Sequence, residues 1–155
     1  MAGLGSGSLL GGEFSRRTKM SLVAAFAAAE GGIAGFGLAS EWIFALLNHN
    51  LAGASLPVAA LVSFLTVLFP TALMGATLPL LVTHLVRTGA AVGRSISMLY
   101  FANTLGSAIA CFMTALMLIE WFGLAGATTV AAMFNILVAL FAFLMLTDRK
   151  LEATS

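Results

Sequence analysis

One acidic residue lies deep within an apolar stretch of this 155-residue chain, and it is the first candidate for chemistry. Glu30 stands between a run of three alanines and a pair of glycines. A charged group at the centre of a bilayer costs at least about 2.5–3.5 kcal/mol, so the carboxylate must be neutral, paired or directed into a polar cavity. Two interpretations stay open: a proton or cation site, or a structural hydrogen bond to another helix, for example to Asn103.

A second group of polar residues occurs near the middle of a later apolar stretch. Tyr100 and Asn103 are three residues apart, and Gly106 follows them, where it would let another backbone approach closely. An amide has both donors and acceptors, which must be satisfied inside the protein when lipid surrounds the helix. We therefore predict a polar site inside the membrane made of Glu30, Tyr100 and Asn103, with a hydrogen bond between helices as the alternative. Asn135 is interpreted in the same way with less support.

The remaining reactive residue types do not assemble into a recognisable site. Cys111 is the only cysteine, and Asp148, near the end of the chain, is the only aspartate. His49 and His84 fall on opposite sides of the predicted membrane. The sequence therefore predicts no metal site, no cofactor and no catalytic residues, so we expect the chain not to be an enzyme. A net charge of +1 also argues against nucleic acid as a partner.

The elements that must position these residues are membrane helices. Hydrophobic residues make up 61% of the chain and charged residues 8%, against about 45–50% and about 25% in soluble domains. We predict an all-α, polytopic transmembrane helix bundle that forms a single domain over 1–155, with no soluble catalytic domain. A short N-terminal segment, 1–15, is too short to cross and is expected to be a half-helix, a re-entrant segment or an interfacial segment. Four apolar tracts are long enough for full spans, at about 20–47, 56–86, 96–119 and 125–146.

The basic residues indicate how these spans are oriented. They occur in three groups, and each pair of neighbouring groups encloses two predicted spans, so all three groups fall on one face. Cytoplasmic loops of membrane proteins carry an excess of Lys and Arg. We therefore predict an integral membrane protein, in a bacterial inner membrane, with a cytoplasmic C-terminus. Trp42 and Trp121, close to Glu41 and Glu120, would lie at the opposite boundary. The predicted cytoplasmic anchors are Arg16, Arg17, Lys19, Arg87, Arg94, Arg149 and Lys150.

Two further patterns concern the shape and packing of the helices. Pro70, Gly75 and Pro79 lie within one tract, where each proline removes a backbone donor, and predict a kinked or broken helix. Such breaks form binding sites in transporters, although a kink that only improves packing is the alternative. Small residues also recur at four-residue spacing, which allows close helix packing. These series are Gly3, Gly7 and Gly11, and Gly31 and Gly35.

Several stretches resemble one known family. Residues 2–17 and 70–81, followed by Gly93 and by residues 99–106, are similar to the membrane domain of the fused major-facilitator-like/spermidine-synthase-like integral membrane proteins. That resemblance implies about one and a half further helices upstream and a cytosolic aminopropyltransferase-like domain. The motifs of such a domain do not occur here, so its catalytic activity is not carried over. The matching positions are Glu30, Pro70, Gly75, Pro79, Tyr100, Asn103 and Gly106.

Three functions are consistent with these patterns. The first is a non-catalytic membrane domain or subunit that anchors or serves a soluble partner, docked at the cytoplasmic C-terminus, or a larger membrane complex. The alternative is a small transporter that acts as an oligomer, with Glu30 as its coupling residue. The third is a structural accessory subunit. The expected partners are the lipid bilayer and either other membrane subunits or further copies of this chain.

Overall fold

The computed structural model describes residues 1–89 and 91–152, with side chains up to residue 146, and every regular element in it is helical. The prediction of an all-α fold is confirmed. The side chains of Arg149 and Lys150 lie outside the described residues. The elements are α1 (Ala2–Arg17), α2 (Leu22–Leu51), α3 (Leu56–Arg87), α4 (Val92–Met113), a π-helical turn (Thr114–Leu118) and α5 (Ile119–Glu152).

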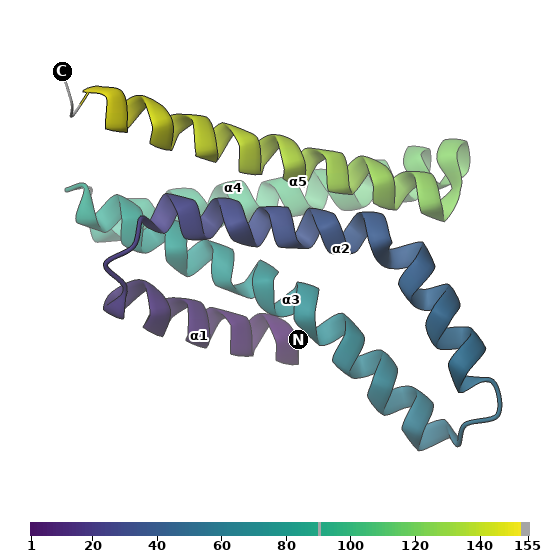
Figure 1. Cartoon of the computed structure of the whole chain (residues 1–155). Coiled ribbons are helices and arrows are strands. Elements are labelled where there is room, and N and C mark those ends of the chain that lie inside the picture. The colour runs from purple at the N-terminus through teal and green to yellow at the C-terminus, as the bar shows by residue number, and fades with distance from the viewer. Residues whose placement is uncertain (90, 153–155) are drawn as a thin grey trace.

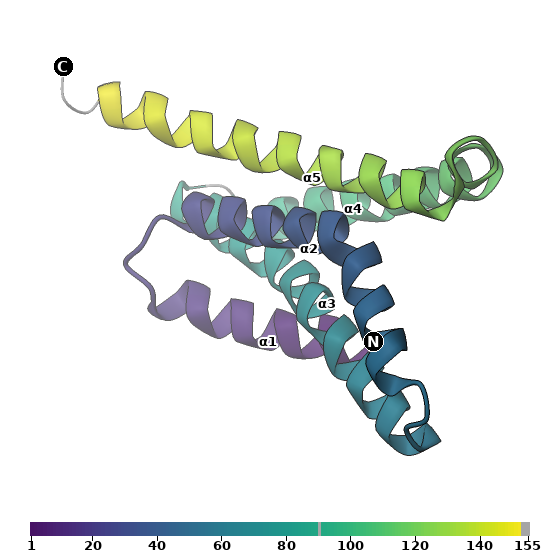
Figure 2. The same cartoon turned by 45° about the vertical axis from the view of Figure 1, so that its right-hand side comes forward.

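The long helices form two antiparallel hairpins (Figure 1). Helices α2 and α3 make the first, and α4 and α5 make the second, with α5 packed along α2. The link between α1 and α2, the beginning of α4 and the end of α5 all lie at one end of the molecule, which we call the basic end. At the other end α2 bends, and the tip of the α2–α3 hairpin diverges from α4 and α5, as Figure 2 shows from a second side.

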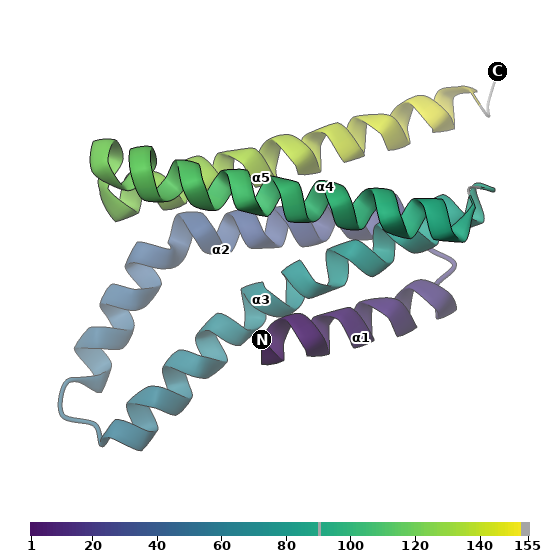
Figure 3. The same cartoon turned by 180° about the vertical axis from the view of Figure 1, so that it is seen from behind.

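Three helical stretches are long and apolar enough to cross a membrane: Leu22–Leu51, Leu56–Arg87 and Val92–Leu146. The third has 55 residues, far more than one crossing needs. It reverses direction at Gly123, whose φ of 67° and ψ of −176° interrupt the helix, and α5 then runs back opposite to α4 (Figure 3). The predicted tracts 96–119 and 125–146 lie on the two sides of this reversal.

Changing Gly123 to Ala is expected to destabilise the second hairpin by about 1–3 kcal/mol, because its backbone conformation is accessible essentially only to glycine. A lower thermal unfolding midpoint of the protein in detergent would report this. Gly35→Ala is the matched control, since nothing lies within 4 Å of a Cβ added there and alanine favours the helix. Equal midpoints for the two variants would contradict the assigned role of Gly123.

Helix α3 is continuous from Leu56 to Arg87 with Pro70 and Pro79 inside it, so the predicted kink or break at Pro70, Gly75 and Pro79 does not take the form of a break. Each proline removes only one backbone hydrogen bond, and those of the neighbouring residues remain. Helix α1 packs along this part of α3. It contacts Ala76 before Pro79 and Thr83 after it, so one helix supports α3 on either side of this proline. The hydroxyl of Thr71 adds a bond to the carbonyl of Val67, at 2.8 Å.

Helix α1 packs parallel to α3 through a face of small residues. Gly3, Gly7, Gly11 and Ser15 are the buried residues of α1. A Cβ added to Gly11 would lie 2.7 Å from the Cα of Ala76, so only glycine permits this approach. Fully buried Ser15 has its Oγ 2.9 Å from the Oγ1 of Thr83 on α3. The first predicted series of small residues is therefore confirmed as a packing face.

The second predicted series does not pack in this way. Gly31 and Gly35 have open space where a Cβ would lie. The buried face of α2 is rotated from them and includes Ala34, which is 1% exposed. A Cβ added to Gly37 would lie 3.3 Å from the Cβ of Ala132 on α5. Gly37 and Ala132 therefore approach each other closely where α2 packs against α5.

Candidate functional site

A partly open cavity of about 900 Å³ between the helices is lined by residues from every helix from α1 to α5, and its lining residues on α4 are exposed. It brings together Glu30, Tyr100 and Asn103, the three residues that were predicted to form a polar site inside the membrane. Gly75 and Gly106 also line it. We call it the Glu30 cavity. Its further polar lining residues are Ser8, Thr77, Ser107 and Asn135.

Glu30 is half-buried and is the only carboxylate among the residues that line this cavity, and no Lys, Arg or His side chain lines it. Among the described residues, no hydrogen bond or ion pair ends on its carboxylate, so the expected bond to Asn103 is not formed. A carboxylate that has no basic partner in apolar surroundings attracts a cation or a proton. The geometry therefore favours a binding role for Glu30 over a structural bond to Asn103.

Helix α4 presents the other two predicted residues from the opposite wall. Tyr100 and Asn103 lie one helical turn apart, and the hydroxyl of Ser107 donates to the backbone carbonyl of Asn103 at 2.7 Å. No hydrogen bond within the described part of the chain ends on the phenol of Tyr100 or on the amide of Asn103. Their oxygen atoms are therefore available to a ligand that also contacts Glu30, since both groups carry acceptors.

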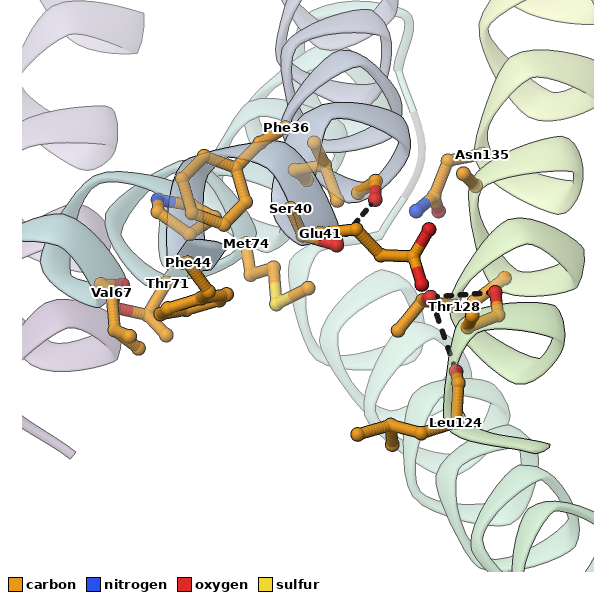
Figure 4. Close-up of a pocket in the computed structure, with 16 residues that line it drawn as sticks. Phe36, Ser40, Glu41, Phe44, Val67, Thr71, Met74, Leu124, Thr128 and Asn135 are labelled. Atoms are coloured by element: carbon orange, nitrogen blue, oxygen red, sulfur yellow. Dashed lines mark hydrogen bonds between the residues drawn. The ribbon is translucent and has the colours of Figure 1, made fainter. Parts of the chain in front are cut away.

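A second cavity, of about 540 Å³, lies between α2, α3 and α5 toward the end where the hairpins diverge. We call it the Glu41 cavity. Figure 4 shows the carboxylate of Glu41 extending from α2 toward α5, where Thr128 and Asn135 lie. Phe36 and Phe44 add aromatic walls.

Sequence reasoning placed Glu41 only near the membrane boundary and missed this cavity. The spacing between Glu30 and Glu41 is the signal that could have found it. Eleven residues (41 − 30) make about three turns of an α-helix, so both carboxylates lie on one face of α2.

The predicted basic anchors lie near one end of the bundle, but Arg87 has an additional function. Its guanidinium donates to the carbonyl of Ser15 at 2.7 Å and to those of Arg16 and Thr18 at 3.4 Å. These carbonyls are at the C-terminus of α1, where a helix leaves acceptors without partners. Arg87 therefore caps α1 and attaches it to the end of α3.

The other described basic residues at this end are exposed. Arg16 pairs with Glu13 at 3.1 Å, and Arg17 pairs with the same carboxylate. Exposed pairs of this kind contribute only about 0–1 kcal/mol. Lys19 and Arg94 are exposed as well, so the basic end is a solvated, positively charged surface.

Within the described part of the chain, no three His, Cys, Asp or Glu residues group in a way that could hold a metal ion. Cys111 is exposed. No protein-family model matches this chain, and neither a curated protein nor a solved structure shows significant similarity to it. The structure defines an all-helical protein with stretches that are long and apolar enough to cross a membrane. The resemblance to the spermidine-synthase-like membrane proteins stays a prediction.

Proposed function

We propose that the chain crosses a membrane four times, with the basic end in the cytoplasm. Two antiparallel hairpins and the reversal at Gly123 support four crossings. The bias of Lys and Arg toward cytoplasmic loops supports the orientation, since Lys19, Arg87 and Arg94 all lie near the basic end. Helix α1, with 16 residues, reaches about 24 Å and packs against part of α3 without spanning the bilayer core.

We further propose that the protein binds a cation at Glu30 and carries it across the membrane, acting as an oligomer. The observation that carries this proposal is the Glu30 cavity, in which one carboxylate without a basic partner faces the polar groups of Tyr100 and Asn103. Oxygen atoms from α2 and α4 would replace part of the water around the cation. A proton competes for the same carboxylate, which makes Glu30 the coupling residue.

Glu30→Gln is expected to weaken cation binding by about tenfold or more, because it removes the negative charge that attracts the cation, and a loss of about 1.4 kcal/mol is already tenfold. A suitable probe is N-methyl-4-phenylpyridinium, which keeps its charge at every pH, measured as binding to purified protein and as uptake into proteoliposomes. Uptake by the unchanged protein, measured at several pH values, should fall as the pH is lowered, because protons compete with the cation for Glu30. Uptake by the variant should be low and independent of pH.

Glu13→Gln is the matched control, since it removes an acid that is exposed and paired with Arg16. It should leave both binding and uptake unchanged. Equal uptake and equal pH dependence for Glu30→Gln and the unchanged protein would remove the coupling role of Glu30 and, with it, the proposed transport function.

A second function is favoured by the arrangement of the basic end. The link after α1, the beginning of α4 and the end of α5 lie there together, which suits a membrane domain that serves a soluble partner. The resemblance to the spermidine-synthase-like family supports the same proposal. Mass measurement of the purified complex tests it, because a monodisperse homodimer without other chains would argue against an accessory subunit.

A further inference from the structure

The two cavities share a wall. Ile33, Met74 and Asn135 line both the Glu30 cavity and the Glu41 cavity. Glu30 and Glu41 lie on one face of α2, roughly 16 Å apart along the helix axis at 1.5 Å per residue. Two acidic cavities therefore follow each other along α2, separated only by these three side chains.

The composition of the Glu41 cavity restricts what it can bind. Glu41 is the only charged side chain among the residues that line it, and Phe36, Phe44 and Met74 give it large apolar walls. A bare metal ion such as Ca²⁺ takes about 6–8 oxygen ligands, which this cavity does not offer. A cation with an apolar body suits it better, since aromatic faces attract positive charge and apolar walls bury the rest of the ligand.

We propose that Glu41 forms an outer binding site for an organic monocation with an aromatic or aliphatic body, and that the cation passes between Glu41 and Glu30 beside Ile33, Met74 and Asn135. The passage rests on the proposed function of Glu30, whereas the outer site stands without it. The amide oxygen of Asn135 accepts the partly dehydrated cation between the two carboxylates. Met74, which has three rotatable side-chain bonds, moves aside more readily than a branched residue.

Glu41→Gln is expected to weaken the binding of N-methyl-4-phenylpyridinium to the purified protein at the outer site by about tenfold, because it removes the negative charge that attracts the cation. Equilibrium binding should then detect one site fewer than in the unchanged protein. Neutral 4-phenylpyridine should bind both proteins equally, because it has the same rings without the charge. Phe44→Leu, which keeps the charge and removes a ring, should also weaken binding of the cation.

Glu120→Gln is the matched control, since Glu120 is exposed, as Glu41 is, but does not line the Glu41 cavity. Asn135→Leu tests the passage: it should reduce uptake at least tenfold and weaken binding at Glu41 less than Glu41→Gln does.

The outcomes separate the two proposals. Unchanged binding in Glu41→Gln, or an equal loss in Glu120→Gln, overturns the outer site even if Glu30→Gln still abolishes uptake. Loss of binding in Glu41→Gln, with no effect of Glu30→Gln, retains the outer site and overturns both the passage and the proposed function. Normal uptake by Asn135→Leu overturns the passage alone.

Discussion

Replacing Gly7 by Leu is expected to separate α1 from α3 and to destabilise the folded protein by about 3 kcal/mol, at the upper end of typical overpacking costs. A side chain at Gly7 would collide with the backbone carbonyl of Ala72, which cannot rotate away as a flexible side chain can. Helices in lipid associate through close packing and not through the exclusion of water. Without the close contact between its glycine face and α3, α1 therefore loses most of the packing that holds it in place.

A cysteine pair makes this separation measurable. The side-chain oxygens of Ser15 and Thr83 are 2.9 Å apart, so Ser15→Cys and Thr83→Cys should form a disulfide when α1 is docked. Cys111 is exposed and is changed to Ser in the background to avoid other pairings. Leu at position 7 should reduce the yield of the disulfide and lower the thermal unfolding midpoint.

Gly5→Leu is the control for this experiment. Gly5 is on the same helix, and nothing lies within 4 Å of a Cβ added there. Its disulfide yield should match that of the parent protein. An equally high yield with Leu at position 7 would mean that α1 is not held against α3 by its glycine face.

The helical fold could be predicted because its main signals are local. Apolar length and composition predicted helices at 20–47 and 56–86, and the structure places α2 and α3 within a few residues of those limits. The separation of the tracts 96–119 and 125–146 was also predicted, and Gly123 provides the reversal between them. These features depend on the residues of one segment and on lipid as its solvent, so a single sequence contains enough information for them.

Features that depend on two helices were harder to predict. Both glycine series have the same four-residue spacing, but only the one on α1 packs closely, because α3 offers a matching surface at Ala72 and Ala76. The prolines of α3 illustrate the same limit. Their sequence predicted a kink or a break, whereas α3 is a continuous helix that packs along the neighbouring α1, which the local pattern does not show.

The candidate site was predicted in part for a related reason. Glu30, Tyr100 and Asn103 could be identified individually, since each is a polar residue in an apolar tract, and the structure places all three around one cavity. Glu41 was missed because its predicted position near the membrane boundary explained it adequately. Only the packing of α5 beside α2 turns it into a cavity residue, next to Thr128 and Asn135.

Charge reversal at Arg87 is the second change with a large expected effect. Arg87→Glu removes the donors that cap α1 at Ser15, Arg16 and Thr18 and places a negative charge beside the negative end of that helix dipole. Since each hydrogen bond to a charged group contributes about 1.5–3 kcal/mol, and water at the basic end recovers part of this, we expect a loss of about 2–4 kcal/mol. The disulfide between positions 15 and 83 should form poorly in this variant.

Arg94→Glu distinguishes capping from membrane orientation. Arg94 lies near the same end of the bundle, and the change alters the net charge by the same amount. Both arginines are exposed, but among the described residues no hydrogen bond involves the side chain of Arg94. If Arg87 acts through the cap, only Arg87→Glu lowers the disulfide yield and the unfolding midpoint. If Arg87 acts only as a basic anchor, the disulfide yield and the unfolding midpoint should fall by the same amount in the two variants. The reason is that a positive-inside bias counts charges and not their hydrogen bonds.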